Sequence, residues 1–438
     1  MKIYKNYGYR IYPTQTQKKW FEEHFEVNRF LYNHLLSCSI KKYNAEVDEN
    51  FLKLIREINF NSEEVQKWTE SDYEKLLKQA KKGVKIYSKN EFSKLITQAI
   101  NNSDFPWVNK SYDGRAMREV ATQVDTAYKN FFKGKGFPKF KKKYSVKSVR
   151  FPVSKQGDWF SIRFEKDNIL VMPKKIRLKI VQHRPFEGEI VAATIKKSNS
   201  GKWFVTILSK VNPPIKLPET GYYVAFDRGV RDYMIGYDTE QILFTIPSFS
   251  YTHSLIDKIA SLRKKLSRKY IVAKQDSRSL EDSKNYQKNK ELLAKAYEKL
   301  RFQKEYYLQQ LSKEIIEKYD IIFLEDLSVK SLASSNLDKN VKKGDRIVQS
   351  RFSRKLMQLS HYRMETLLKE KAELYGKRVV VLPKGFKSNG NCSNCGIDFE
   401  KSISLNMNKF TCSNCNVTLG RSENSVKNIL KEGMKYLL

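Results

Sequence analysis

Hydrophobic and polar positions in the first third of the chain predict one strand followed by helices. Residues 3–12 are rich in tyrosine and isoleucine and end at Pro13, a pattern typical of a strand. Thr14 and Gln17 then have the spacing of a capping box, and apolar side chains recur after them at helical intervals. The predicted helical stretches are residues 14–35, 70–102 and 117–131.

Residues 149–212 show a different pattern, in which short β-rich runs alternate with Gly, Asn and Pro breaks. This spacing predicts a small antiparallel barrel or sandwich, to which the strand at residues 3–12 can also belong. The helices between them would then be an insertion. The predicted strands are residues 149–153, 159–164, 169–172, 190–195 and 203–208.

Prolines at 213, 214 and 218 mark a predicted boundary, beyond which the pattern changes again. The apolar run at residues 321–324 is typical of a strand buried on both faces, and strands alternate with long helices around it. This order predicts an α/β domain. The predicted strands are residues 222–226, 233–246, 321–324 and 379–382, and the predicted helices lie within residues 255–315 and 352–375.

The net charge of the chain predicts what kind of partner it binds. The 438 residues include 83 Lys+Arg against 48 Asp+Glu, a net charge of +35, and self-repulsion of that size favours a polyanionic partner. Nucleic acid is the predicted partner, and a basic protein that binds none is the alternative. No stretch has 18 uninterrupted apolar residues, and the N-terminus lacks a signal-peptide core. We therefore expect no membrane partner and a cytoplasmic location.

The basic connector, defined as residues 133–150, concentrates this charge. Gly134, Gly136 and Pro138 prevent it from continuing a helix. We predict that its cations contact nucleic acid, and a solvated charged loop is the alternative. These cations are Lys133, Lys135, Lys139, Lys141, Lys142, Lys143, Lys147 and Arg150.

Four of the five cysteines form two pairs with metal-ligand spacing. Cys392 and Cys395 make one knuckle, and Cys412 and Cys415 make the other. Four thiolates can close a tetrahedron round one zinc ion and leave no position open, so a structural Zn²⁺ is predicted. Two chance pairs of buried thiols are the alternative. Cys38 lies among apolar residues and is expected to fill a core.

Acidic residues also stand at two predicted strand ends. Asp227 follows the strand at 222–226, and Glu325 and Asp326 follow the strand at 321–324. Acids at the ends of adjacent strands can converge on divalent cations, as nucleases require. Capping or solvated carboxylates explain the same pattern, so these positions alone leave both interpretations open.

These motifs together resemble the TnpB family of RNA-guided transposon nucleases, which are relatives of type V CRISPR effectors. The order of Asp227, Glu325-Asp326, the four-cysteine insert and a helix with Asn424 and Asn428 is similar to the RuvC-like domain of that family. The likeness spans nearly the whole chain. Further similar motifs are Arg10–Pro13 with Gln17, Arg29–Asn33, Asn130–Gly134 and Phe137–Phe140.

The resemblance implies a multidomain α+β protein. A small wedge-type β-barrel would hold an inserted helical recognition domain, and an α/β RuvC/RNase H-like domain with a four-Cys zinc module would follow. The implied partners are a guide RNA derived from a transposon end and a double-stranded DNA target with a short adjacent motif, bound by a monomer in the nucleoid of a prokaryotic cell. The implied ranges are 1–12 and 137–215 (barrel), 13–136 (recognition), 219–385 and 420–438 (RuvC-like) and 386–419 (zinc).

One departure from the family changes the expected activity. The family has an Asp-Arg-Asp-x-Asn pattern whose second Asp is the third catalytic acid, whereas this chain has Gly420, Arg421, Ser422, Glu423 and Asn424. A neutral hydroxyl is a poor Mg²⁺ ligand, which leaves Mg²⁺ in doubt and Asp227 and Glu325 as a remnant pair. Arg228 further brings a cation beside the site.

The chain thus resembles nuclease-dead TnpB-like proteins called TldR. The predicted function is RNA-guided, sequence-specific DNA binding with an inactivated RuvC centre, so that the protein is not an enzyme and represses transcription by occupying its target. The alternative is an active RNA-guided endonuclease that uses a relocated acid such as Glu423. A one-residue shift on a helix turns a side chain by about 100°, which disfavours this rescue. A general RNA-binding protein or a transposon remnant is the third possibility.

Overall fold

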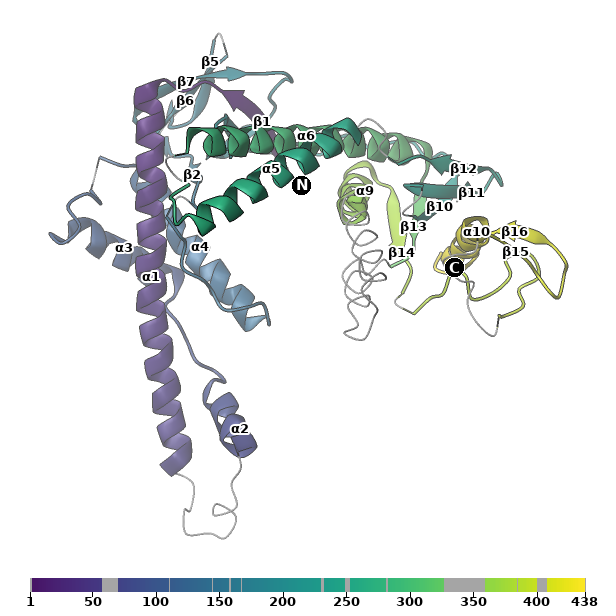
Figure 1. Ribbon diagram of the computed structural model, residues 1–438, viewed down its shortest axis with the longest axis horizontal. Helices are drawn as coiled ribbons and strands as arrows, with labels where there is room; N and C mark the ends of the chain where they lie inside the picture. Colours follow the sequence, from purple (N-terminus) through teal and green to yellow (C-terminus); the bar gives the residue numbers. More distant parts are fainter. Residues whose placement is uncertain are drawn as a thin grey trace. The chain divides into compact units, whose positions relative to one another are not determined.

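The computed structural model divides into two compact units, Met1–Asn212 and Pro213–Leu438 (Figure 1). Within the described residues no helix combines the length and apolar character that a membrane crossing requires. The described residues are 2–56, 70–109, 111–143, 145–156, 159–166, 168–229, 232–248, 253–280, 283–326, 359–383, 385–399 and 408–437.

Unit 1 is built on a seven-stranded sheet in which every pair of neighbours is antiparallel. The N-terminal strand β1 lies inside it, paired with β9 along its whole length. Alternate side chains, Tyr7, Tyr9 and Ile11, therefore enter the core on one face. In spatial order the strands are β2 (Ser148–Pro152), β8 (Glu189–Lys197), β9 (Trp203–Val211), β1 (Ile3–Ile11), β7 (Ile176–Val181), β6 (Ile169–Met172) and β5 (Arg163–Glu165).

The predicted antiparallel β-structure is confirmed, including the contribution of the N-terminal strand. Two elements differ from the prediction: β7 was not predicted, and a two-stranded hairpin, β3 (Lys155–Gln156) with β4 (Trp159–Phe160), stands apart from the main sheet. The hydrogen-bonded order ends at β2 and β5, and no pairing joins these two strands within the described residues. Closure into a barrel therefore stays a prediction.

The first helix of unit 1 begins at the capping box that the sequence indicates. Thr14 and Gln17 exchange the two hydrogen bonds of a capping box, Thr14 N to Gln17 Oε1 at 2.9 Å and Gln17 N to Thr14 Oγ1 at 3.3 Å. The first helix then runs to Arg56, beyond the predicted end at residue 35. Its apolar side packs against α3 and α4 in one core. The helices are α1 (Gln15–Arg56), α2 (Glu70–Ala80), α3 (Lys89–Asn101) and α4 (Gly114–Phe132).

Unit 2 contains a mixed five-stranded sheet. Its first strand, β10, is central: it pairs antiparallel with β11 and parallel with β13, which pairs parallel with β14. This topology confirms the predicted α/β character. The order is β12 (Leu243–Ile246), β11 (Met234–Asp238), β10 (Tyr223–Arg228), β13 (Ile321–Leu324) and β14 (Arg378–Val381).

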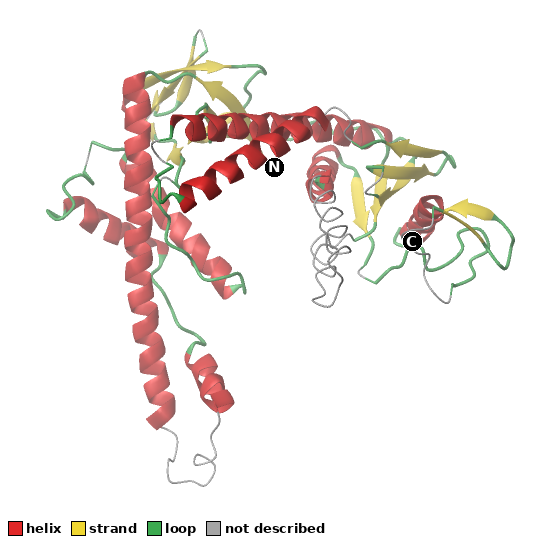
Figure 2. Cartoon of the chain, in the orientation of Figure 1, coloured by secondary structure: helices red, strands yellow, loops and turns green. Residues whose placement is uncertain are grey.

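Helices cover both faces of this sheet (Figure 2). Even-numbered side chains of β10 pack with α6 and α9, and odd-numbered ones pack with α10. The helices are α5 (His253–Gln275), α6 (Lys284–Lys318), α9 (His361–Tyr375) and α10 (Arg421–Met434), and a two-stranded sheet, β15 (Lys409–Thr411) with β16 (Thr418–Gly420), precedes α10. Residues 352–358, predicted to begin the helix that contains α9, lie outside the described residues.

We expect Gly433→Ala to lower the stability of unit 2. A Cβ atom at Gly433 would meet the Phe323 ring at 2.3 Å, so this glycine lets α10 lie close to the sheet. Overpacking costs about 1–3 kcal/mol and opposes the roughly 1 kcal/mol by which alanine favours a helix. Urea unfolding should show a lower midpoint, whereas Lys431→Ala on the exposed side of α10 should leave it unchanged. A midpoint that rises would contradict this packing.

Candidate acid site and four-cysteine module

Strand register brings Asp227 and Glu325 together. Phe226 is the register partner of Leu324 in the parallel pair β10–β13, so Asp227 and Glu325 occupy the next position on adjacent strands. Neighbouring strands lie about 4.8 Å apart, and equivalent residues point to the same face. That face is the one covered by α10. We call these two residues the acid pair.

Burial and mutual repulsion disfavour the charged forms of the acid pair. Burial raises the pKa of Asp227, while the nearby Ser422 hydroxyl and Arg421 guanidinium act in the opposite direction. Burial also raises the pKa of Glu325, and the negative charge of Asp227 adds to the rise. Ser388 offsets part of it by donating its hydroxyl to Glu325 Oε2 at 3.0 Å. The pair is therefore poorly solvated and contacted mainly by hydrogen-bond donors.

The start of α10 decides what faces Asp227. The helix begins at Arg421, and Ser422 and Ser425, three residues apart on one face, both act on the Asp227 carboxyl. Ser425 Oγ is buried, and within the described structure no hydrogen bond of standard geometry reaches it, although it is near enough to lower the pKa of Asp227. Among the described residues, the groups that act on Asp227 from this side are thus two hydroxyls and a guanidinium, and no third carboxylate is among them.

Glu423 has other partners. Its carboxylate accepts a hydrogen bond from Gly420 N at 3.4 Å and pairs with Lys427 Nζ at 2.7 Å. These contacts stabilise the first turn of α10, which agrees with the expectation that Glu423 points away from the acid pair. Within the described residues, only the four cysteines near the C-terminus form a group of three or more potential metal ligands of the Cys, His, Asp and Glu types. Among the described residues, those around Asp227 and Glu325 thus supply two carboxylates, whereas the family pattern has three catalytic acids.

Arg228 lies on the opposite side of the sheet from the acid pair. Its buried guanidinium pairs with Glu365 of α9 at 2.7 Å and also donates to the backbone carbonyl of Glu325. Its charge still lowers the pKa values of Asp227 and Glu325. Arg228 thus holds the end of β13 against β10, with its charge balanced by Glu365.

The four cysteines form a closed cluster, which we call the four-cysteine module. All four Sγ atoms lie within 4.8 Å of one another, and the pairs Cys392–Cys415 and Cys395–Cys412 are 3.8 and 3.7 Å apart. Four sulfurs at about 2.3 Å from a tetrahedral zinc ion would be about 3.8 Å apart. The side-chain amide of Asn414 lowers the pKa of Cys395, which favours its thiolate. The cluster can therefore hold a metal ion such as zinc.

Both knuckles have the same backbone geometry. The residue after the second cysteine, Gly396 or Asn416, has a positive φ of 79° or 54°. Its amide donates to the carbonyl of Cys392 or Cys412, at 2.8 and 2.9 Å respectively. Asparagine tolerates this left-handed conformation better than most residues, so Asn416 keeps the turn that a glycine would make.

The basic connector does not present all of its cations in the same way. Lys133, Lys135, Lys139, Lys142, Lys143 and Arg150 are exposed. Lys141 instead lies with its ammonium 3.8 Å from the centre of the Tyr32 ring and 2.8 Å from Gln123 Oε1. Burial lowers the pKa of Lys141 to about 8. Its backbone N–H and C=O are bonded to the side chain of Asn33, so Lys141 anchors the connector to α1.

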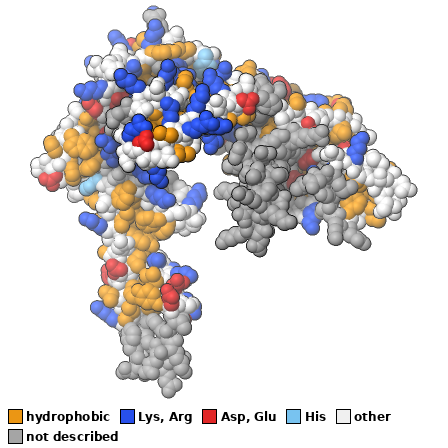
Figure 3. Space-filling model, in the orientation of Figure 1, with side chains coloured by type: hydrophobic (Ala, Val, Ile, Leu, Met, Phe, Trp, Pro, Cys, Tyr) orange, Lys and Arg blue, Asp and Glu red, His pale blue; other side chains and the backbone are white. Residues whose placement is uncertain are grey.

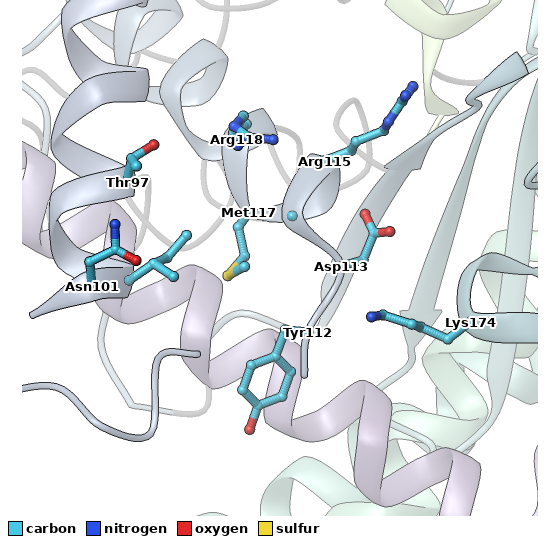
Figure 4. A pocket seen from close by; sticks show the side chains of 10 residues that line it. Thr97, Asn101, Tyr112, Asp113, Arg115, Met117, Arg118 and Lys174 are labelled. Carbon is cyan, nitrogen blue, oxygen red and sulfur yellow. The ribbon is translucent and has the colours of Figure 1, made fainter. Parts of the chain in front are cut away.

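A cationic cavity of about 550 Å³ lies beside the start of α4 (Figure 4). Arg115 and Arg118 of α4 and Lys174 of a short 3₁₀ helix (Pro173–Lys175) line it, together with Asp113, which caps α4 by accepting from Ala116 N. The excess of cations suits an anionic group such as a phosphate. These residues were not predicted from the sequence. Arg115, two residues before the predicted helix at 117–131, and Arg118, within that helix, were the available signal.

Comparisons with known proteins agree with this architecture. Residues 1–47 match the family model HTH_OrfB_IS605, described as a helix-turn-helix domain, and residues 361–429 match the Cas12f1-like, TNB domain. The first range forms β1 and the beginning of the single long helix α1. The second contains α9, the four-cysteine module and the start of α10.

Relatives match over most of the chain. "Putative RNA-guided DNA endonuclease InsQ" of Escherichia coli (strain K12) is 24% identical, over 77% of this chain and 78% of that protein. "TnpB-like protein L79" of Acanthamoeba polyphaga mimivirus is 22% identical, over 97% of this chain and 72% of that protein. A solved structure, "Cryo-EM structure of the Cas12f1-sgRNA-target DNA complex", covers 98% of both chains at 14% identity with a TM-score of 0.46.

The protein has mixed α/β content. It combines a four-cysteine cluster with the acid pair, Asp227 and Glu325, at the end of two adjacent parallel strands. Because family models match at both ends and relatives match along nearly its whole length, the chain is similar to the TnpB family.

Replacing Cys412 with serine should release the metal from the module. Cys412 is buried, and three thiolates bind zinc more weakly than four. We expect metal analysis of the purified protein to fall from about one zinc per chain to well below one, together with a lower melting temperature. Cys38→Ser, far along the chain in α1, is the matched control and should keep the metal. An unchanged zinc content in the Cys412 variant would exclude this site.

Asp227→Asn should stabilise the protein at neutral pH. Because the folded-state pKa of Asp227 is raised, its ionisation costs stability as pH rises through that value. The amide removes this cost, and we expect a higher melting temperature than that of the wild type. The difference should vanish below about pH 4, where the aspartate is protonated in both states. The exposed Asp257→Asn should show no such pH dependence.

Proposed function

We propose that this protein is an RNA-guided, sequence-specific DNA-binding protein with an inactive nuclease centre, which represses transcription by occupying its target. The observation that carries the proposal is Ser422. It stands where the family pattern has a catalytic aspartate, and its hydroxyl acts on Asp227 at the place where a third carboxylate would be needed. This function corresponds to the TldR group of TnpB-like proteins.

The surroundings of the acid pair support inactivity. Divalent cations in nucleases are held by several carboxylates, which also offset the cost of burying those charges. Here the third ligand is replaced by the hydroxyl of Ser422, which acts on Asp227. These features favour binding without cleavage.

The charge and its distribution support nucleic-acid partners. Figure 3 shows Lys and Arg side chains gathered on the visible face, and α5 carries a row of exposed cations. The connector interleaves its lysines with the exposed aromatic rings of Phe137 and Phe140, which suits contacts to phosphates and stacking on bases. The exposed cations of α5 are Lys258, Arg263, Lys264, Lys265, Arg268 and Lys274.

Guide RNA and target DNA would share these surfaces. The relatives named as RNA-guided DNA endonucleases support a guide RNA, which we infer derives from a transposon end, and a double-stranded target with a short adjacent motif. Sequence would then be read by base pairing, with the protein contacting backbone and shape. We assign unit 1 to the wedge-type barrel and recognition helices, and unit 2 to the RuvC-like domain with a structural zinc.

An active endonuclease that uses Glu423 is the alternative function. Its support is the acid itself, one residue from the expected position. The pairing of Glu423 with Lys427 and Gly420 N weighs against it, because both contacts would have to break before the carboxylate could reach the acid pair. Productive geometry tolerates little displacement of such groups.

The wild-type protein, purified with its bound RNA, should retain a matched plasmid fragment in a gel but leave it uncut in Mg²⁺. Ser422→Asp restores the family carboxylate next to Asp227, and we expect it to produce linear, guide-dependent product at a rate at least about 100-fold above wild type, the usual scale for one essential catalytic group.

Two controls separate the alternatives. Ser422→Asn has a similar size but no charge and should remain inactive. Guide-dependent cleavage by wild type that disappears in Glu423→Gln would establish the endonuclease instead. If no single RNA species accompanies the protein and no fragment is retained, guided binding itself is refuted.

A further inference from the structure

Two buried asparagines on α10 are not explained by the acid pair or by metal ligation. Asn424 is 0% exposed and Asn428 is 4% exposed, and they lie four residues apart on one face of the helix. Burying an amide is costly unless its donors and acceptor are bonded, so each needs specific partners. We call these two residues the asparagine clamp.

The clamp binds the backbone of residues 388–393, which lead into the first cysteine knuckle. Asn424 Oδ1 accepts from Ser393 N at 2.7 Å, and Asn424 Nδ2 donates to Asn391 O at 2.9 Å. Asn428 Nδ2 donates to Asn391 O and to Ser388 O, both at 3.0 Å. The two side chains therefore fix this segment at three points against α10.

The clamped segment contacts a different structure at each end. At its beginning, Ser388 donates its hydroxyl to Glu325 Oε2 at 3.0 Å, so its backbone position determines where that donor lies. Near its end, Cys392 stands between Asn391 and Ser393, the two residues that Asn424 holds. One rigid segment thus joins the first cysteine of the four-cysteine module to the acid pair.

We propose that Asn424 and Asn428 are positioning residues that couple the four-cysteine module to the acid pair, so that metal binding by the cysteines fixes Ser388 against Glu325. Closing the module holds Cys392 in place, the clamp transmits that position along residues 388–393, and the Ser388 hydroxyl stays on the carboxylate. Without the metal, Cys392 is released and the segment loosens from α10. This inference rests on the metal-binding part of the proposed function and requires no nuclease activity.

Hydrogen exchange of the full-length protein with its bound RNA tests the coupling. Metal removal by a chelator and the isosteric Asn428→Asp, which loses both donated bonds, should each speed exchange in peptides covering residues 385–393 and 321–326. The expected increase is about tenfold, the scale of losing one or two hydrogen bonds. Peptides from α9 and from β9 should not change. An equal increase in α9 would indicate general unfolding and overturn the proposal.

Ser388 variants test whether the clamp acts through this hydroxyl. Ser388→Ala should speed exchange at residues 321–326, whereas Ser388→Thr, which keeps a hydroxyl, should restore the wild-type rate. In the Asn428→Asp background, Ser388→Ala should add nothing further at residues 321–326, because the clamp acts through Ser388. Additive effects of the two changes would refute that route. Lys431→Ala, exposed on the same helix, is the matched control.

Metal analysis distinguishes failure of the proposed zinc site from failure of the proposed coupling. Asn428→Asp should retain the zinc content of wild type, because its side chain holds the segment and not the ion. If the purified wild type contains no metal, the proposed zinc site fails, whereas the Asn428 and Ser388 variants still report on the clamp. If zinc is present but its removal leaves residues 321–326 unchanged, the zinc site stands and the coupling is wrong.

Discussion

The parallel pairing of β10 with β13 determines where the polar groups of unit 2 can act. With Phe226 opposite Leu324, odd-numbered residues of both strands face α10 and even-numbered ones face α6 and α9. A slip of one residue would send Glu325 to the other face of the sheet. The same alternation separates Arg228 from Asp227 although they are neighbours in sequence. One register thus creates an acidic side and a basic, ion-paired side at the same sheet edge.

Much of the fold could be predicted from local pattern, and the exceptions have physical causes. The run at residues 321–324 matches β13 because a strand buried on both faces leaves a continuous apolar signal. The strand β7 was missed although Ile176, Leu178 and Ile180 alternate with charged residues, because the run follows closely on β6. The helix α1 passes its predicted end because Tyr43 and Val47 pack in a separate core with Ala80 and Val84, which no local pattern reveals.

Some residues of the candidate site could likewise be predicted from local sequence, and others could not. The cysteine knuckles and the acids are short-range motifs and were found from their spacing. The partners that set their chemistry are distant in sequence: Glu365 for Arg228, Ser388 for Glu325 and the backbone of Asn391 for both Asn424 and Asn428. Residue type alone cannot reveal such partners, because strand register and helix docking select them. For the same reason the sequence identified Ser422 as a departure but could not show that it faces Asp227.

The inward position of Lys141 affects how steeply the affinity of the proposed nucleic-acid complex would fall as the salt concentration rises. Each phosphate that a cation neutralises releases about one condensed counterion, so the steepness of binding against salt concentration counts phosphate contacts and not lysines. The ammonium of Lys141 is already engaged by Tyr32 and Gln123. It contributes rigidity to the connector in place of counterion release, so the effective number of phosphate contacts falls below the number of cations in residues 133–150.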